Sequence, residues 1–225
     1  ASPDALVRLL DGWRGGRIVV VGDFMLDRYV YGHADRLSPD APVPVLSVQR
    51  QEYKPGGAAN VSLQLRALKC EVECLGVVGA DDAAEQLKRH LADAGCGVRG
   101  LVTADDRPTT VKHNYVGLAQ HRHPQKMFRV DEEVRRPITD KTADRLVKAA
   151  TRALKGADAL CIEDYNKGVL QSAVCKRLIA AAGEAGVPVQ VDPAAIDDYA
   201  EYAGASCITA NRTEAGRARG IEKDG

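Results

Sequence analysis

Two glycines and a carboxamide stand directly before a stretch with the apolar spacing of a helix. Gly56 and Gly57 precede Ala58-Ala59-Asn60, and residues 57–69 carry the helical pattern. Glycine lets the backbone adopt a positive φ and lets a ligand approach the main chain closely. The first N–H groups of a helix have no partner within that helix. The stretch fits a cradle for a polar ligand, although a plain turn before a helix fits it too.

Other polar residues follow predicted strands at the point where each strand ends. Gly22-Asp23, Glu163-Asp164, Asp192-Pro193 and Asn211 each come after a short apolar run. Such residues can simply cap the next helix. In a parallel sheet, however, the carboxyl ends of the strands meet at one edge, and ligands bind there. The shared position, together with Gly56-Gly57, favours a single site at that edge.

The order of the predicted elements supports such a sheet. Strands and helices alternate from residue 17 onward, which predicts a mostly parallel sheet with helices on both faces. Two extended regions outside this alternation, within about 28–52 and 109–131, are expected to form a small β lid. We expect one domain over residues 1–225. Its strands are predicted at 17–23, 71–79, 157–164, 187–193 and 205–211, and its helices at 57–69, 81–95, 139–156, 172–186 and 212–220.

The composition argues against several classes of protein. The 31 basic and 31 acidic residues give a formal net charge of zero, which disfavours nucleic-acid or membrane-surface binding driven by bulk charge. No apolar run approaches the roughly 20 residues that span a bilayer, and the N-terminal stretch has no signal-peptide core. We expect a cytoplasmic protein with neither nucleic acid nor membrane as partner. The six cysteines form no C-x-x-C pair and are expected to be buried, reduced thiols.

Several motifs, spaced along most of the chain, resemble those of the ribokinase-like (PfkB) family of carbohydrate kinases. They are GDFMLDRYVYG at 22–32, PGGAAN at 55–60, EDYNKG at 163–168 and TANRTE at 209–214. Within that family the closer resemblance is to the heptose-7-phosphate kinases, and RLSPDAPVPV at 36–45 is its most specific element. The resemblance implies a three-layer α/β/α fold with a mostly parallel sheet and a small β lid.

The resemblance also implies an activity. This is transfer of the ATP γ-phosphate to the anomeric C1 hydroxyl of D-glycero-β-D-manno-heptose 7-phosphate. The 1,7-bisphosphate product would serve ADP-heptose and lipopolysaccharide core synthesis. ATP and Mg²⁺ are the implied cofactors. Lid strands that pair between protomers would make the protein a homodimer.

Sugar-binding residues follow from the matched motifs. Asp23, Asp27 and Asn60 can exchange hydrogen bonds with sugar hydroxyls, while Gly56 and Gly57 match the glycine pair of the family. We expect Gly57→Val to abolish sugar binding and to leave the fold intact. A substrate that already carries a phosphate also needs fixed cations. Further substrate contacts, including the candidate cations, are expected from Arg36, Lys112, Arg129, Asp164 and Lys167.

The nucleotide is expected at the other end of the predicted site. The TANRTE motif matches the element of the family that lies near magnesium and the nucleotide phosphates. Asn211 and Glu214 are three residues apart at a helix opening and so share one face. Glu214 is expected to hold Mg²⁺ through water. The predicted nucleotide contacts are Asn211, Arg212, Thr213 and Glu214.

Three features depart from the family pattern. Residues 1–225 contain no Gly-Ala-Gly-Asp sequence, the element that supplies the anion hole and the catalytic base. We therefore predict no catalytic residue here, and expect these residues alone to lack the catalytic segment and to be inactive. Ala210 stands where proline is usual, and the lysine that often follows Asp192-Pro193 is absent.

Other functions remain compatible with the residues. They are another ribokinase-like sugar or nucleoside kinase, or a catalytically silent sugar-phosphate-binding module. A nicotinamide-dependent Rossmann enzyme is a weaker alternative, because the G-x-G-x-x-G turn is absent from the first strand.

Overall fold

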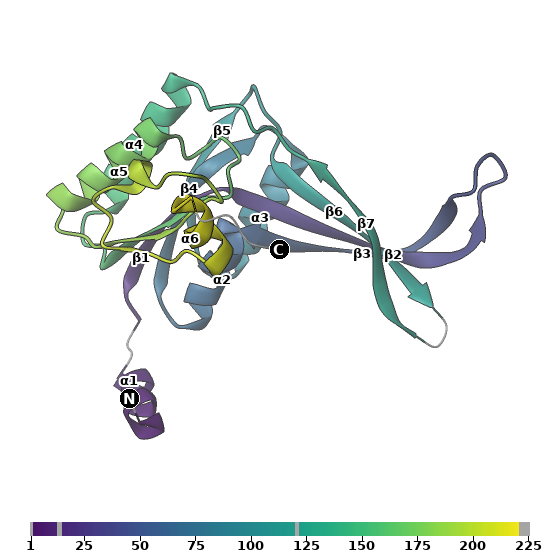
Figure 1. The fold of residues 1–225 in the computed structure, drawn as a ribbon, viewed down its shortest axis with the longest axis horizontal. Helices are drawn as coiled ribbons and strands as arrows, with labels where there is room; N and C mark the ends of the chain where they lie inside the picture. Colours follow the sequence, from purple (N-terminus) through teal and green to yellow (C-terminus); the bar gives the residue numbers. More distant parts are fainter. Residues whose placement is uncertain (1, 13–14, 120–121, 221–225) are drawn as a thin grey trace.

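The computed structural model describes residues 2–12, 15–119 and 122–220 (Figure 1). Its main sheet has six strands in the order β10-β9-β8-β1-β4-β5, and every neighbouring pair is parallel. The predicted parallel sheet is therefore confirmed. The strands are β1 (Arg17–Gly22), β4 (Glu71–Gly79), β5 (Gly97–Ala104), β8 (Ala159–Glu163), β9 (Val189–Asp192) and β10 (Cys207–Ile208).

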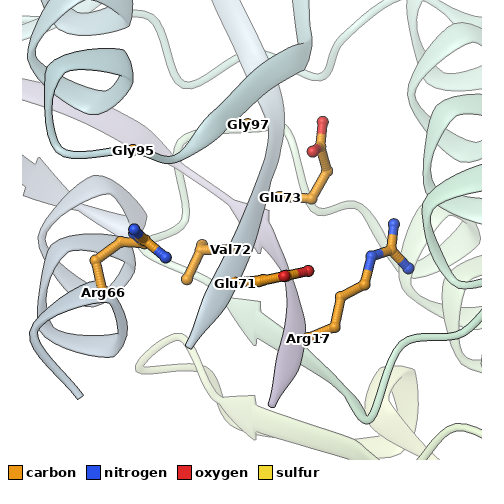
Figure 2. Close-up of a pocket in the computed structure, with 7 residues that line it drawn as sticks. All are labelled: Arg17, Arg66, Glu71, Val72, Glu73, Gly95 and Gly97. Atoms are coloured by element: carbon orange, nitrogen blue, oxygen red, sulfur yellow. The ribbon is translucent and has the colours of Figure 1, made fainter. Parts of the chain in front are cut away.

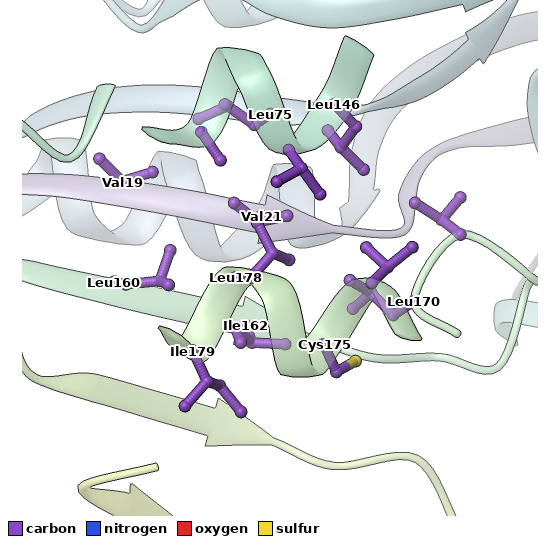
Figure 3. Close-up of a cluster of buried hydrophobic side chains, with 14 of the residues drawn as sticks. Val19, Val21, Leu75, Leu146, Leu160, Ile162, Leu170, Cys175, Leu178 and Ile179 are labelled. Atoms are coloured by element: carbon purple, nitrogen blue, oxygen red, sulfur yellow. The ribbon is translucent and has the colours of Figure 1, made fainter. Parts of the chain in front are cut away.

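Helices cover both faces of this sheet, and β1 shows why. Its alternating side chains enter two separate cores, with Val19 and Val21 on one side and Ile18 and Val20 on the other. Helices α4 and α5 close the first core, part of which Figure 3 shows, and α2 and α3 close the second. The helices are α2 (Ala58–Ala67), α3 (Asp82–Asp93), α4 (Asp140–Ala153) and α5 (Ser172–Glu184).

Local sequence sets where these helices begin and end. The Asp81 side chain accepts a hydrogen bond from the Ala84 N–H and begins α3, and Thr139 does the same for α4 through the Thr142 N–H. Gly95, at φ 81°, follows α3 and ends it. These short devices fix the loops that connect the helices to the carboxyl ends of the strands.

The predicted lid is a second sheet, which projects from one end of the main body (Figure 1). Its order is β3-β2-β6-β7, with β2 antiparallel to β3, β2 parallel to β6, and β6 antiparallel to β7. The predicted lid segment 109–131 includes residues 120 and 121, which lie outside the described residues. The lid strands are β2 (Phe24–Leu37), β3 (Pro44–Gly57), β6 (Thr110–Ala119) and β7 (Arg122–Glu132).

Some elements differ from the prediction. Strand β5 and the helix α1 (Pro3–Gly12) were not predicted, nor was the short 3₁₀ helix η1 (Ala200–Tyr202). All six cysteines are free thiols, but Cys207 is exposed and Cys161 half-buried, so the expectation of buried cysteines is wrong at these two positions. Among the described helices, none combines the length and the apolar character needed to cross a bilayer.

Candidate functional site

Strand β3 runs directly into helix α2, so Gly56 and Gly57 end a strand instead of forming a separate turn. Gly57 has φ 55°, and a Cβ atom there would lie 2.5 Å from the carbonyl oxygen of Asp23. That carbonyl accepts a hydrogen bond of 3.1 Å from the Ala58 N–H. The ends of β1 and β3 are thus packed backbone to backbone. The expectation that Gly57→Val spares the fold is therefore not supported, because the glycine is needed for main-chain packing.

Asp27 lies at the base of the lid, against the same glycine pair. A Cβ atom on Gly56 would lie 2.8 Å from Asp27 Oδ2, so glycine leaves room for this carboxylate. Lys54 and Lys112 are its cross-strand neighbours on β3 and β6. Partial burial raises the pKa of Asp27, and the charge of Lys112 acts in the opposite direction. Asn60 is exposed in the first turn of α2. An acceptor and a carboxamide thus flank the strand-to-helix junction.

Asp23 has a different environment from Asp27. It is 2% exposed, and its Oδ2 accepts hydrogen bonds from the N–H groups of Tyr165 (2.9 Å) and Lys167 (3.1 Å). Burial, together with the nearby Asp164 carboxylate, raises the pKa of Asp23 to about 6. The side chain holds the loop that follows β8. Its predicted contact with sugar stays a prediction, and the geometry supports the local role.

Several polar side chains of the loop after β8 are bound to other groups of the protein. Asp164 accepts hydrogen bonds from the Asn166 N–H (2.8 Å) and the Tyr202 hydroxyl (2.7 Å). Lys167 Nζ lies 2.6 Å from Glu133 Oε2, just beyond β7. Both side chains were predicted to contact substrate, yet both are bound to protein groups here. The loop presents Tyr165 to the lid instead, with its ring centroid 6.0 Å from Lys112 Nζ.

Two of the predicted cations, Arg129 and Arg36, are poorly placed to bind the sugar phosphate. The exposed Arg129 forms two hydrogen bonds to Asp131, of 2.6 and 2.9 Å. Arg36 is exposed near the tip of the β2–β3 hairpin, where it pairs with Val45. Nine residue-to-residue steps of extended strand separate it from Asp27, a distance of about 30 Å. The geometry within one protomer therefore does not support a contact of Arg36 with the sugar beside Asp27, and that contact stays a prediction.

The predicted nucleotide segment opens helix α6 (Arg212–Ala218) directly after β10. Asn211 Oδ1 accepts from the N–H groups of Thr213 and Glu214, and Glu214 Oε2 accepts from the Asn211 N–H at 2.8 Å. This reciprocal pair is a capping box. Arg212 and Thr213 are exposed.

The charges of two carboxylates, Asp192 and Glu214, interact beside this capping box. The pKa of Asp192, at the end of β9, is raised by burial and by the charge of Glu214. Carboxylates that repel each other in this way suit a divalent cation that keeps part of its water shell. The residues present therefore fit Mg²⁺, although in the described chain no group of three or more His, Cys, Asp or Glu gathers as a metal cluster.

Glu163 makes the stability of the protein depend on pH. Burial and the charge of Asp192 raise its pKa from 4.5 to about 7. The folded state then keeps a proton that the unfolded state releases, so stability falls as pH rises from 4.5 to about 7. We expect Glu163→Gln to stabilise the protein by roughly 1–3 kcal/mol at pH 8 and to be neutral near pH 4.5. Urea unfolding of the full-length protein across this range measures it.

The matched control for this experiment is Glu184→Gln, at an exposed position at the end of α5. Because this side chain is exposed, its replacement should change the free energy of unfolding little. A pH-independent effect of Glu163→Gln would show that Glu163 ionises normally in the folded state.

Two neighbouring cavities of the described chain lie away from these polar groups. One of about 400 Å³ is lined by Arg17, Arg66 and Glu73 at the amino ends of β1 and β4 (Figure 2), and one of about 430 Å³ adjoins it. Two guanidinium groups there already donate to main-chain carbonyls, Arg17 to Ala153 and Arg66 to Ala94. These cavities lie at the amino ends of the strands, whereas sugar and nucleotide binding are predicted at the carboxyl ends.

Comparison with known proteins gives a consistent picture. A family model with the description "pfkB family carbohydrate kinase" matches residues 16–224. The Bifunctional protein HldE of Caulobacter vibrioides is 43% identical over 219 residues, and that of Gluconobacter oxydans is 40% identical over 214 residues. The alignments cover 97% and 95% of this chain but 43% of each relative, so the chain spans less than half of their length.

A solved structure supports the fold independently. The Arabidopsis thaliana ribokinase complexed with ribose and ATP superimposes with a TM-score of 0.62 at 20% identity. The superposition covers 92% of this chain and 63% of that chain. The three-layer arrangement with a small second sheet is therefore the ribokinase-like fold.

Proposed function

The chain belongs to the pfkB family of carbohydrate kinases, and from this membership we propose that the whole protein phosphorylates a heptose phosphate. The acceptor is the C1 hydroxyl of D-glycero-β-D-manno-heptose 7-phosphate, and the donor is ATP. The product serves ADP-heptose and lipopolysaccharide core synthesis, and because ATP is the donor we place the reaction in the cytoplasm. The HldE relatives support this choice of sugar.

One observation carries the proposal most directly. The carboxylate of Asp27 lies against Gly56, where the lid meets the carboxyl edge of the sheet. An acceptor there suits the hydroxyl groups of a sugar, which all donate hydrogen bonds. Lys112 and Tyr165 face one another across the same opening. The lid then covers the sugar and excludes water, which would otherwise compete as phosphoryl acceptor.

The nucleotide is proposed to bind at the opening of α6. Asn211 and Arg212 offer polar groups to the phosphates, and Asp192 and Glu214 hold Mg²⁺ through water. The ion neutralises charge on the transferred phosphoryl group when it is bound. The Gly-Ala-Gly-Asp sequence does not occur in residues 1–225, and we assign no general base among these residues.

Glu214→Gln separates the metal role from the capping role. Glutamine also completes a capping box, so α6 should keep its stability. The loss of charge should raise the Mg²⁺ concentration needed for half-maximal activity of the full-length protein, by roughly threefold to tenfold. A magnesium titration at saturating ATP measures this change. A titration identical to that of the wild type would leave Glu214 only its capping role.

The substrate assignment is tested with the full-length protein. ADP release is measured with heptose 7-phosphate, fructose 6-phosphate, ribose and adenosine as acceptors, and the phosphorylated position is determined by ³¹P NMR. We expect turnover with heptose 7-phosphate and a new phosphate at C1. Preferred turnover of ribose or adenosine would favour another kinase of the same fold. Binding of heptose 7-phosphate without ADP release would favour a silent sugar-phosphate-binding module.

We propose that two copies associate through their lids. The edge strands β3 and β7 each have one neighbour in the lid sheet, and exposed edges readily pair with another chain. Val48, Phe128 and Val130 add apolar side chains that are 49%, 52% and 48% exposed. Light scattering of the full-length protein should give the mass of a dimer. Phe128→Glu should shift the mass toward that of a monomer.

A further inference from the structure

The lid face that carries Asp27, here called the inner face, also holds aromatic and charged side chains. Residues two apart on a strand point to the same side, so Tyr29 shares this face with Asp27. In cross-strand register, Lys54 and Lys112 flank Asp27, and Glu52 lies beside Tyr29 on β3. The inner face thus runs outward from the acid at the sheet edge to an aromatic ring.

Lys126 joins the inner face from the opposite edge of the lid. It lies on β7, where it pairs with Val116 of β6. Its Nζ is 5.6 Å from the centroid of the Tyr29 ring, and Lys54 Nζ is 5.1 Å from the same centroid. The ring therefore lies within cation–π range of ammonium groups from two different strands.

Most cations around this face already have an acidic partner. The contacts of Lys112 and Lys126 in the described chain are instead with aromatic rings, those of Tyr165 and Tyr29. Both lysines also act on Asp27, whose pKa their charges lower against the effect of burial. The cations that pair with acids are Arg129 with Asp131, Lys167 with Glu133, and Arg50 and Lys54 with Glu52.

We propose that Lys112 and Lys126 bind the phosphate group that the sugar substrate already carries. This inference rests on the proposed function and names the part of the site that recognises a phosphorylated sugar. The reacting hydroxyl must face the nucleotide at the sheet edge, so the far end of the sugar points outward along the lid. Lys126 lies in that direction, beyond Asp27 and Tyr29 on the inner face.

The chemistry of the two lysines suits a phosphate. A lysine ammonium is a compact point charge with three donors, and two of them neutralise a phosphate dianion. Tyr29 supplies a ring beneath the chain of the sugar. Arg129 already donates two hydrogen bonds to Asp131, so we do not assign it to the phosphate. Because Lys126 is exposed, its replacement should leave the fold unchanged.

The test compares a phosphorylated and an unphosphorylated ligand on the full-length protein. We expect Lys126→Gln to raise the KM for heptose 7-phosphate roughly tenfold to a hundredfold, with the KM for ATP unchanged. The dissociation constant for the free heptose, measured by calorimetry, should be the same in the wild type and the variant. Lys148→Gln, at an exposed position on α4, is the matched control and should change neither value.

The outcomes separate the two proposals. A wild-type protein that does not phosphorylate heptose 7-phosphate overturns the proposed function. A wild-type protein that does so, with a KM unchanged in Lys126→Gln, overturns the phosphate site alone. Equal losses for the free heptose and for heptose 7-phosphate would also overturn it, because the lysine would then act on the sugar and not on its phosphate.

Discussion

Asp27→Asn is expected to raise the KM for the sugar phosphate tenfold to a hundredfold while the KM for ATP changes little. The carboxylate faces the opening between the lid and the sheet edge, against Gly56. A hydrogen bond to a charged acceptor contributes about 1.5–3 kcal/mol, and each 1.4 kcal/mol corresponds to a factor of ten in affinity. Steady-state kinetics of the full-length protein with each substrate varied in turn measure both constants.

Asp23→Asn is the matched control, because Asp23 is also an aspartate at the same junction. Its carboxylate is buried and accepts hydrogen bonds from the N–H groups of Tyr165 and Lys167. The carbonyl oxygen of asparagine can accept the same two bonds, so this replacement should change neither KM strongly. An equal rise in both KM values for Asp27→Asn would contradict a role in sugar binding. So would a larger KM effect at Asp23 than at Asp27.

Gly57→Val is expected to destabilise the fold by about 2–5 kcal/mol. A left-handed conformation costs an L-residue about 1–2 kcal/mol, and overpacking adds about 1–3 kcal/mol. The new side chain would meet the Asp23 carbonyl and the buried Met25 side chain. For a domain of this size each kcal/mol lowers Tm by roughly 2–4 °C. Calorimetric or circular-dichroism melting of the full-length protein measures the shift.

Gly56→Ala provides the comparison within the same glycine pair. Its nearest neighbour would be the Asp27 carboxylate, the movable end of a side chain, so the alanine should displace that group and weaken sugar binding with a smaller loss in Tm. A Gly57→Val protein that melts like the wild type but no longer binds sugar would restore the simpler interpretation, in which the glycines serve the ligand alone.

The sequence predicted the parallel sheet well because its signal is local. The buried strands are short runs rich in apolar residues, and polar residues that the fold brings to one edge stand at the ends of β1, β8 and β9. Strand β5 was missed because Arg99 and Gly100 interrupt its apolar run. The strand-to-helix junction at Gly57 was also ambiguous, since two glycines fit a turn as well as a close backbone contact.

We predicted Lys112 from the sequence but not Lys126, because the position of a cation relative to Asp27 depends on register and on distant partners. Arg36 and Lys126 are similar in a list of basic residues. In the structure, however, Arg36 lies near the tip of the β2–β3 hairpin, whereas Lys126 lies beside the Tyr29 ring. Likewise, the residues next to Lys167 in the sequence do not predict that Lys167 forms an ion pair with Glu133. Tyr29 was more accessible, since it lies two residues beyond Asp27 on a predicted extended segment.

The parallel pairing of β2 with β6 has a consequence for how the chain folds. These two strands form the centre of the lid, yet β3, α2, β4, α3 and β5 lie between them in the sequence. Closing so long a loop is slow unless the intervening chain is already compact. We therefore expect β1, β4 and β5 to assemble first and the strands of the lid to pair last. Pulse-labelling hydrogen exchange should find the amides of β4 protected before those of β6, so that a newly made chain acquires its sheet before it can hold a sugar.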